Sequence, residues 1–231
     1  LLGCDIWIVS PGIPLNVPII VRGKEAGIEM ISEIEFGYRI KSSDSTVIAI
    51  TGSNGKSTTV SLIHHILLSL GKKSILAGNI GDAFCSYPIH KPGIEYIVLE
   101  ISSFQLDLIQ SFAPHVAAVL NISPDHLNRY AGYSAYCKSK MRIFSAQTDS
   151  DYAIVSRDSS EIARHSSGIL SQMMNFSLTD TQCSAYFADK FVHVGEHLLS
   201  VYDLGLKGPH NVQNVMAALL CAKALNLDME I

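Results

Sequence analysis

The sequence lacks several features that would place it in a specialised class of protein. It contains no apolar run of the roughly 18–20 residues that a membrane-spanning helix needs. Its first residues carry no basic segment ahead of an apolar stretch, so they do not resemble a signal peptide. No internal repeat or low-complexity tract is visible. These absences favour an ordinary globular protein without membrane insertion.

An excess of positive charge is also missing. The chain contains 17 Lys and Arg against 21 Asp and Glu, which gives a formal net charge of −4. We therefore expect no nucleic-acid binding, because that activity usually needs a broad basic surface. A local phosphate site is compatible with this balance, since backbone N–H groups and one lysine suffice for it.

The five cysteines form no C-x-x-C pair and are scattered along the chain. This pattern predicts reduced, mostly buried thiols in a cytoplasmic protein, rather than disulfides or a metal cluster. With 48% hydrophobic residues over 231 positions, the chain can bury a sizeable core, which excludes disorder.

Short apolar runs alternate with amphipathic segments, which predicts an α/β fold with a mostly parallel sheet. Strands are expected over residues 4–9, 28–30, 46–50, 74–77, 96–99, 116–120 and 152–155, with antiparallel hairpins over 185–201. Helices are expected over residues 19–26, 32–38, 60–70, 133–146 and 211–225. The small polar residues 42–45 indicate a linker, so the predicted domains cover residues 1–44 and 45–231.

The stretch TGSNGKSTT (51–59) carries the clearest chemical signal. A β-rich run leads into a glycine-containing loop, and Lys56 and Ser57 open an amphipathic helix. Such a loop turns backbone N–H groups towards phosphates, while the lysine neutralises charge and the hydroxyl can ligate Mg²⁺. The general spacing G-x-x-x-x-G-K-[ST] is not met, because Ile50 stands where the first glycine belongs. The alternative is an ordinary glycine turn with a surface lysine.

Two further stretches follow apolar runs typical of buried strands. Glu100 ends one run, at the edge where open α/β sheets bind ligands, so its carboxylate is a candidate for the Mg²⁺ of a nucleotide. Asp125 and His126 follow the next run and are candidates to hold a hard metal ion, directly or through water. The alternatives are a cap or salt bridge for Glu100 and a hydrogen-bonded structural role for His126.

Two helical segments complete the set of candidates. Lys138, Lys140 and Arg142 lie on a predicted helix, and their simplest interpretation is a solvated basic face. Asn211 and Asn214 are three residues apart, so their amides share one face of the last helix, where they could read a nucleobase or cap the helix. Each of these signals is weak singly, whereas the combination is specific.

Together these stretches resemble the ATP-dependent Mur ligases. The strings that carry the resemblance are TGSNGKSTT (51–59), GNIG (78–81), LEISSFQL (99–106), NISPDHLNRY (121–130), KSKMRI (138–143) and GPHNVQNVMAA (208–218). Residues 10–13 and 31–35 are similar to the later part of the N-terminal domain of these ligases. The Ser-Ser-Phe-Gln string beside Gly-Lys-Ser-Thr favours the member that adds D-glutamate. Sister ligases tend to carry Gly-Lys-Thr, and folylpolyglutamate synthase is a more distant alternative.

The resemblance implies a central P-loop-type ATPase domain and the remnant of an N-terminal Rossmann-like domain. The implied reaction is an ATP-dependent amide synthesis in peptidoglycan precursor assembly, which adds D-glutamate to UDP-N-acetylmuramoyl-L-alanine through an acyl phosphate. The implied cofactors are ATP and two Mg²⁺ ions, and the implied protein is a cytoplasmic monomer. A nucleotide-binding fragment without turnover is the alternative from a different class.

The resemblance also implies roles for individual residues. ATP would be bound by Gly52, Ser53, Asn54, Gly55, Lys56, Ser57, Thr58, Asn211 and Asn214. The acceptor would be bound by Ser10, Asn79, Ser102, Ser103 and Gln105. The metal ligands would be Ser57, Glu100, His126 and Lys140, and the catalytic residues Lys56, His126 and Lys140. Lys140 aligns with a lysine that is carbamylated in this family, which turns a cation into an anion.

Two departures from the family pattern carry expectations of their own. Asn128 stands where the D-H-x-D-R pattern usually has Asp, which removes a negative charge near the second metal. The chain is short beside a three-domain ligase, so we expect the start of the N-terminal domain and the whole C-terminal domain to be missing and the fragment to be inactive by itself.

Overall fold

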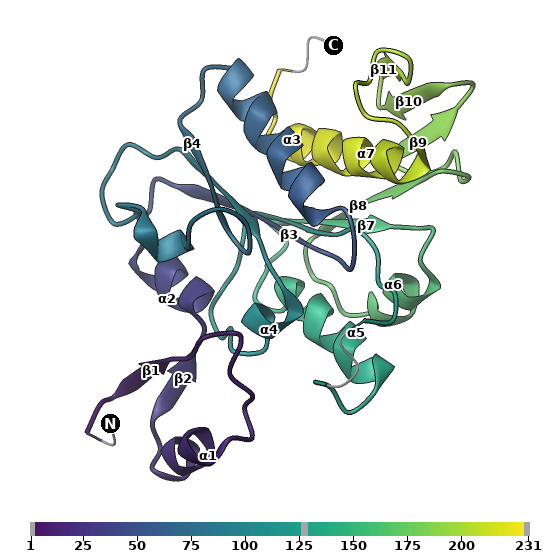
Figure 1. Cartoon of the computed structure of the whole chain (residues 1–231). Coiled ribbons are helices and arrows are strands. Elements are labelled where there is room, and N and C mark those ends of the chain that lie inside the picture. The colour runs from purple at the N-terminus through teal and green to yellow at the C-terminus, as the bar shows by residue number, and fades with distance from the viewer. Residues whose placement is uncertain (1–2, 126–128, 229–231) are drawn as a thin grey trace.

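A computed structural model describes residues 3–125 and 129–228 of the chain. Its strands form a two-stranded sheet of order β1-β2 and a nine-stranded sheet of order β11-β10-β9-β8-β7-β6-β3-β5-β4. Figure 1 shows the small N-terminal sheet and α1 beyond one end of the large sheet, joined to it through α2.

The elements follow one another along the chain with the following bounds. The strands are β1 (Ile6–Ile8), β2 (Glu29–Ile31), β3 (Thr46–Thr51), β4 (Ser74–Gly78), β5 (Tyr96–Glu100), β6 (Val116–Val119), β7 (Tyr152–Ser156), β8 (Gln172–Ser177), β9 (Ala185–Ala188), β10 (Phe191–Val194) and β11 (His197–Ser200). The α-helices are α1 (Pro18–Glu25), α2 (Glu33–Ile40), α3 (Lys56–Ser69), α4 (Ser103–Leu106), α5 (Tyr133–Met141), α6 (Ser160–His165) and α7 (Pro209–Ala224). Short 3₁₀ turns cover Phe84–Ser86 and Arg142–Phe144.

The N-terminal unit consists of the parallel pair β1 and β2 and the helix between them. A small core around Val9, Ile20 and Met30 holds α1 against the pair. Helix α1 begins at Pro18, whose fixed φ suits the first helical turn. The strands and helices expected over residues 4–38 are confirmed, with ends shifted by at most two residues.

The large sheet is parallel from β4 to β9 and continues into the antiparallel strands β10 and β11. This confirms the predicted α/β fold with a mostly parallel sheet. Strand β3 lies between β5 and β6, and its side chains alternate between two cores. Ile48 and Ile50 pack towards α3 and α7, whereas Val47 and Ala49 face the core that α2, α4, α5 and α6 cover. Helices on both faces bury the central strands completely, as parallel sheets require.

Three elements were not expected from the sequence: α4, α6 and β8. Helices α4 and α6 are shorter than two turns, so an apolar stripe cannot develop in them. Strand β8 reads QMMNFS and its first residues are exposed, so it lacks the apolar run of its neighbours. The helix expected over 133–146 ends at Met141 and continues as a 3₁₀ turn.

A buried carboxylate joins α2 to the segment that follows α4. Glu35 is fully buried and accepts hydrogen bonds from the backbone N–H groups of Gln110, Ser111 and Phe112 at 2.9–3.0 Å. The Ser111 hydroxyl at 2.6 Å and Arg39 Nε at 2.8 Å donate to the same carboxylate. This junction fixes the position of α2 against the large sheet.

A second junction connects the N-terminal loop to the large domain through Arg129. Its guanidinium donates to the carbonyls of Pro11 and Gly12, both at 3.2 Å, and lies 4.4 Å from the centre of the Phe104 ring. Phe104 belongs to α4, which follows β5. The Arg129 side chain therefore connects residues 11–12 to the large domain at the carboxyl end of that strand.

The thiols behave as the sequence predicts. All five cysteines are free, and Cys137, Cys183 and Cys221 are buried. Among the helices of the described residues, none has both the length and the apolar character that crossing a membrane requires.

Candidate nucleotide and metal site

The loop after β3 is held in place by Asn121, which is separated from the end of β6 by Leu120 alone. The Asn121 side chain accepts from Asn54 N–H at 2.9 Å and donates to Asn54 O at 3.0 Å, while Asn121 O accepts from Ser53 N–H at 3.0 Å. Gly55 caps the start of α3 with φ +84, and a Cβ there would lie 2.2 Å from Asn214 Oδ1. A glycine is therefore required at this point, and the first N–H groups of α3 remain free of helical partners.

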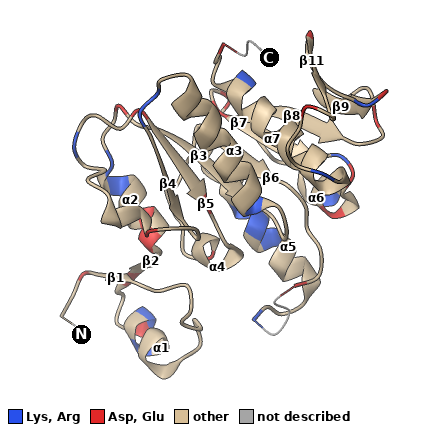
Figure 2. Ribbon diagram, turned by 45° about the horizontal axis from the view of Figure 1, so that its top comes forward, with Lys and Arg blue, Asp and Glu red and all other residues tan. Residues whose placement is uncertain are grey.

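Two lysines from separate helices converge on this loop. Lys56 Nζ donates to Gly52 O at 3.1 Å and to Ser53 O at 3.2 Å, and Lys140 Nζ donates to the same Gly52 O at 2.8 Å. Figure 2 shows the basic residues of α5 close to the end of α3 where Lys56 lies. Two ammonium groups on one carbonyl create a positive region that suits an anionic ligand.

Glu100 and Ser57 meet beside the loop. Ser57 Oγ donates to Glu100 Oε2 at 2.7 Å, and Asn79 Nδ2 donates to Glu100 Oε1 at 2.8 Å. Glu100 is 2% exposed at the carboxyl end of β5, next to β3 in the sheet. The parallel order of the strands thus places a carboxylate from one motif beside the hydroxyl of another.

Seven of the predicted site residues line a cavity of about 270 Å³. It is lined by Gly52, Ser53, Lys56, Asn79, Ser102, Ser103, Phe104, Asp125, Tyr136 and Lys140. Tyr136 and Phe104 had no role in the sequence-based prediction. The spacing of Tyr136, four residues before Lys140 on α5, could have indicated that both share one helix face.

Lys140 is buried, with 2% of its surface exposed, and its ammonium lies 4.9 Å from the centre of the Tyr136 ring. Burial, with the nearby Lys56 ammonium, lowers the pKa of Lys140 from 10.5 to about 7. The interpretation of residues 138–142 as a solvated basic face is therefore wrong for Lys140 and right for the exposed Lys138. Arg142 is exposed as well, and it donates to the carbonyls of Leu106 and Ile109 at 2.8 and 2.7 Å.

Two predicted acceptor contacts lie elsewhere. The Gln105 side chain closes a capping box, with Oε1 accepting from Ser102 N–H and from Ser102 Oγ, both at 2.9 Å. Its carbonyl oxygen thus fixes the start of α4. Ser10 is exposed in the N-terminal loop and does not line the cavity.

The two asparagines of α7 have different surroundings. Asn214 is 4% exposed, packs against Gly55 and donates to Asn211 Oδ1 at 3.2 Å. Asn211 donates to Lys207 O at 2.8 Å. Neither caps the helix, because Gly208 is the N-cap and no side chain bonds there. The two side chains thus connect the loop before α7, at Lys207, with the loop before α3, at Gly55.

A family model for the Mur ligase middle domain matches residues 50–222. The chain belongs to this family. The curated relatives include a UDP-N-acetylmuramoylalanine–D-glutamate ligase of Trichlorobacter lovleyi, 39% identical over 231 residues, covering 98% of this chain and 51% of the relative. The equivalent protein of Pelobacter propionicus is 39% identical over 223 residues, covering 94% and 50%. This chain therefore spans about half the length of the curated relatives it matches.

Solved structures of Mur ligases share the fold. MurF from Acinetobacter baumannii superposes with a TM-score of 0.67 at 23% identity, over 86% of this chain and 46% of that one. A UDP-N-acetylmuramate:L-alanyl-gamma-D-glutamyl-meso-diaminopimelate ligase from Neisseria meningitides gives a TM-score of 0.71 at 14% identity, over 97% and 75%. At these identities the likeness concerns the fold alone.

The second predicted metal position cannot be compared with the described part of this Mur ligase domain. His126 and Asn128 lie outside the described residues. Within residues 3–125 and 129–228, no group of three or more His, Cys, Asp and Glu side chains is arranged to hold a metal ion. A nucleotide-bound Mg²⁺ needs fewer protein ligands, because phosphates and waters complete its shell.

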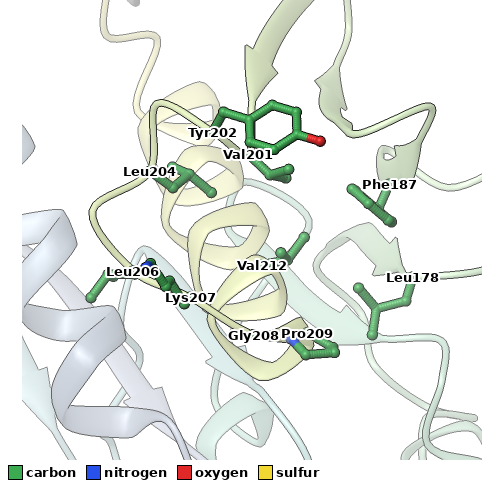
Figure 3. A pocket seen from close by; sticks show the side chains of 10 residues that line it. All are labelled: Leu178, Phe187, Val201, Tyr202, Leu204, Leu206, Lys207, Gly208, Pro209 and Val212. Atoms are coloured by element: carbon green, nitrogen blue, oxygen red, sulfur yellow. The ribbon is translucent and has the colours of Figure 1, made fainter.

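A larger cavity of about 630 Å³ lies between the first turn of α7 and the β9–β11 hairpin. Figure 3 shows its apolar walls, which include Phe187, Leu204 and Val212. None of the residues predicted to bind ATP or acceptor lines it. The smaller cavity beside the glycine loop, rather than this larger one, is therefore the candidate site of this Mur ligase domain.

Proposed function

We propose that this chain forms the ATP-binding part of a ligase that joins D-glutamate to UDP-N-acetylmuramoyl-L-alanine. One observation carries the proposal: the loop lysine Lys56, the buried Lys140 and the Asn79–Glu100 pair meet around a single cavity, although they come from four separate stretches of sequence. The names of relatives with 39% identity support the same pair of substrates.

In the proposed reaction, a carboxylate oxygen of the acceptor attacks the γ-phosphorus of ATP, and ADP leaves. The amine of D-glutamate then attacks the acyl carbon, inorganic phosphate leaves, and the nitrogen loses a proton. A carboxylate is a poor acceptor for an amine, and phosphorylation turns one of its oxygens into a leaving group. The protein's contribution to such a transfer is mainly positioning and charge neutralisation.

The residues of the cavity suit that contribution. The free N–H groups at the start of α3 would receive phosphate oxygens, as helix N-termini commonly do. Lys56 would exchange its two loop carbonyls for a phosphate oxygen, which relieves its competition with Lys140 for Gly52 O. Asn211 and Asn214 would lie on the adenine side, and Ser102 and Ser103, which line the cavity, would face the acceptor.

Ser57 and Glu100 fit the Mg²⁺ ion of a nucleotide. Their oxygens are 2.7 Å apart, close to the separation of about 2.9 Å between neighbouring ligands of an octahedral Mg²⁺. When bound, this ion would neutralise charge on the phosphoryl group that is transferred. A second Mg²⁺ supported by His126 and Lys140 is part of the same proposal.

Lys140 is proposed to carry a carbamate. Its depressed pKa keeps a large share of the amine neutral near pH 7, and a neutral amine can attack CO₂. The nitrogen forms a bond to carbon and loses a proton, so the buried cation becomes an anion. This removes the repulsion between Lys140 and Lys56 and provides a carboxylate beside the cavity.

The proposed domain division places residues 1–44 in a domain that binds the UDP precursor and residues 45–231 in the central ATP-binding domain. The separate sheets of the two parts support it. Helix α2 lies before this boundary, although its Ile34 packs into the core of the large sheet. We further propose a cytoplasmic monomer, in keeping with five free thiols.

ADP formation tests the proposal. The purified full-length protein is given ATP, Mg²⁺, UDP-N-acetylmuramoyl-L-alanine and D-glutamate, and ADP is expected only when all four are present. Replacing the acceptor or the amino acid with another in the same assay distinguishes the D-glutamate ligase from a sister Mur ligase and from folylpolyglutamate synthase. Calorimetry with ATP and Mg²⁺ separates the remaining cases: binding without turnover indicates a nucleotide-binding fragment, and no heat of binding contradicts the nucleotide site itself.

A further inference from the structure

The turn after β4 holds Glu100 by its backbone and its side chain together. Asn79 N–H donates to Glu100 O at 2.8 Å, and Asn79 Nδ2 donates to Glu100 Oε1 at 2.8 Å. Gly78 makes this approach possible: its φ is +103, and a Cβ there would lie 2.3 Å from Glu100 O. The amide of Asn79 is therefore aimed at the carboxylate by the course of the backbone.

The two oxygens of Glu100 have different partners. Oε1 accepts from the Asn79 amide, and Oε2 accepts from the Ser57 hydroxyl. Because the carboxylate is 2% exposed, it has little room to turn and exchange these partners. A cation at the Ser57 hydroxyl would therefore meet a single oxygen of Glu100, while the other oxygen stays hydrogen-bonded.

We propose that Asn79 is a positioning residue that keeps Glu100 monodentate and thereby selects Mg²⁺ over Ca²⁺ at the nucleotide. Mg²⁺ demands near-octahedral geometry with single oxygen ligands, whereas Ca²⁺ is larger and readily takes both oxygens of a carboxylate. The Asn79 amide that occupies Oε1 allows binding of a cation through one oxygen of Glu100 and blocks binding through both. This inference rests on the proposed function, because it assumes that Ser57 and Glu100 hold the metal of a nucleotide.

The experiment measures ADP affinity by calorimetry in the presence of MgCl₂, CaCl₂ or EDTA. No acceptor is added, so a change cannot come from a substrate contact of Asn79. Asn79→Ala is expected to weaken ADP binding with Mg²⁺ about 10–100-fold, the usual effect of removing a partner of a metal ligand. Binding with Ca²⁺ should change less than threefold or improve, and binding in EDTA should stay as in the wild type.

Two further variants keep the test decisive. Asn79→Leu retains a side chain of similar size and the backbone hydrogen bond but removes the donor without adding a charge, so it should show the same loss with Mg²⁺ even where Asn79→Ala fails to fold. Asp82→Asn is the matched control, since Asp82 is exposed in the same turn, and it should leave all three affinities unchanged.

Three results would each be informative. An unaltered ratio of Mg²⁺ to Ca²⁺ affinity in both Asn79 variants overturns the inference. An equal loss with Mg²⁺, Ca²⁺ and EDTA also overturns it, because that pattern indicates a general distortion of the site. If wild-type protein binds ADP equally well with Mg²⁺ and EDTA, the proposed metal site itself fails, and with it this part of the proposed function.

Discussion

Replacing Glu35 provides the most direct test of how the fold holds helix α2. The carboxylate accepts from three consecutive backbone N–H groups, at Gln110, Ser111 and Phe112, and also from the Ser111 hydroxyl and Arg39. Because the Glu35 side chain is completely buried, water cannot replace it for the inner donors. The substitution Glu35→Gln keeps the shape but removes the charge and turns an NH₂ group towards these donors.

The expected cost follows from the contacts. Breaking a buried, hydrogen-bonded charge pair costs about 3–5 kcal/mol, so Glu35→Gln should lower the free energy of unfolding by that amount. Glu29→Gln is the matched control, since Glu29 contacts the same Arg39 at 2.8 Å but its side chain is 33% exposed. Solvent screens an exposed pair, so the control should lose far less stability than Glu35→Gln. Urea denaturation at neutral pH measures both values.

The stabilisation that Glu35 provides should also depend on pH, in a direction that its pKa determines. Burial alone would raise the pKa of Glu35, but hydrogen bonds from Gln110, Ser111 and Arg39 outweigh it and hold the pKa below 4.5. The folded protein therefore binds this proton less tightly than the unfolded chain does. Its stabilisation is complete above pH 4.5 and is lost as the pH falls through the lower, folded-state pKa. A difference between wild type and Glu35→Gln that is the same at neutral and strongly acidic pH, or no larger than that of Glu29→Gln, would refute this reasoning.

Three other substitutions have defined outcomes. Lys140→Met should be more stable than wild type in CO₂-free buffer below pH 7, because the folded-state pKa of about 7 makes the buried ammonium costly, and this advantage should vanish as the pH rises to 10.5. Urea titrations test it, and a pH-independent difference, or the same effect in the exposed Lys138→Met, would count against it. Gly78→Ala should lower the melting temperature by an amount equivalent to at least about 2 kcal/mol of stability. The reason is that the new Cβ would lie 2.3 Å from a backbone oxygen of β5 and that φ at this position is +103. A loss of stability in scanning calorimetry that is less than half of the expected loss contradicts this prediction. Arg129→Ala should release residues 11–12 and lower the fluorescence anisotropy of Trp7, the single tryptophan, and an unchanged anisotropy would exclude Arg129 as the connection.

Much of the fold could be predicted because its signals are local. The buried strand β3, the glycine loop and the stripe of α3 follow directly from neighbouring residues, and the parallel sheet follows from their alternation with helices. The elements that were missed depend on tertiary packing. Helix α6 buries little beyond Ile162, and β8 is recruited by its pairing with β7 rather than by its own composition.

The candidate site divides in the same way. Lys56, Ser57 and Glu100 stand at strand and helix ends that the sequence indicates, and the structure brings them together. The burial of Lys140 could not be read from its neighbours, because it depends on how closely α5 approaches the loop after β3. The orientation of the Asn79 side chain towards Glu100 could not be predicted either, since it arises from pairing between β4 and β5.

The central place of β3 also dictates an order of assembly. This strand needs β5 and β6 as neighbours, and its loop needs Asn121, which comes 67 residues after Asn54. During synthesis the glycine loop therefore cannot reach its final shape until the chain beyond residue 121 has left the ribosome. Contacts between residues so far apart slow folding, because a long loop must close before the contacts form. The nucleotide site is thus one of the late features of folding, although Lys56 is synthesised well before Asn121.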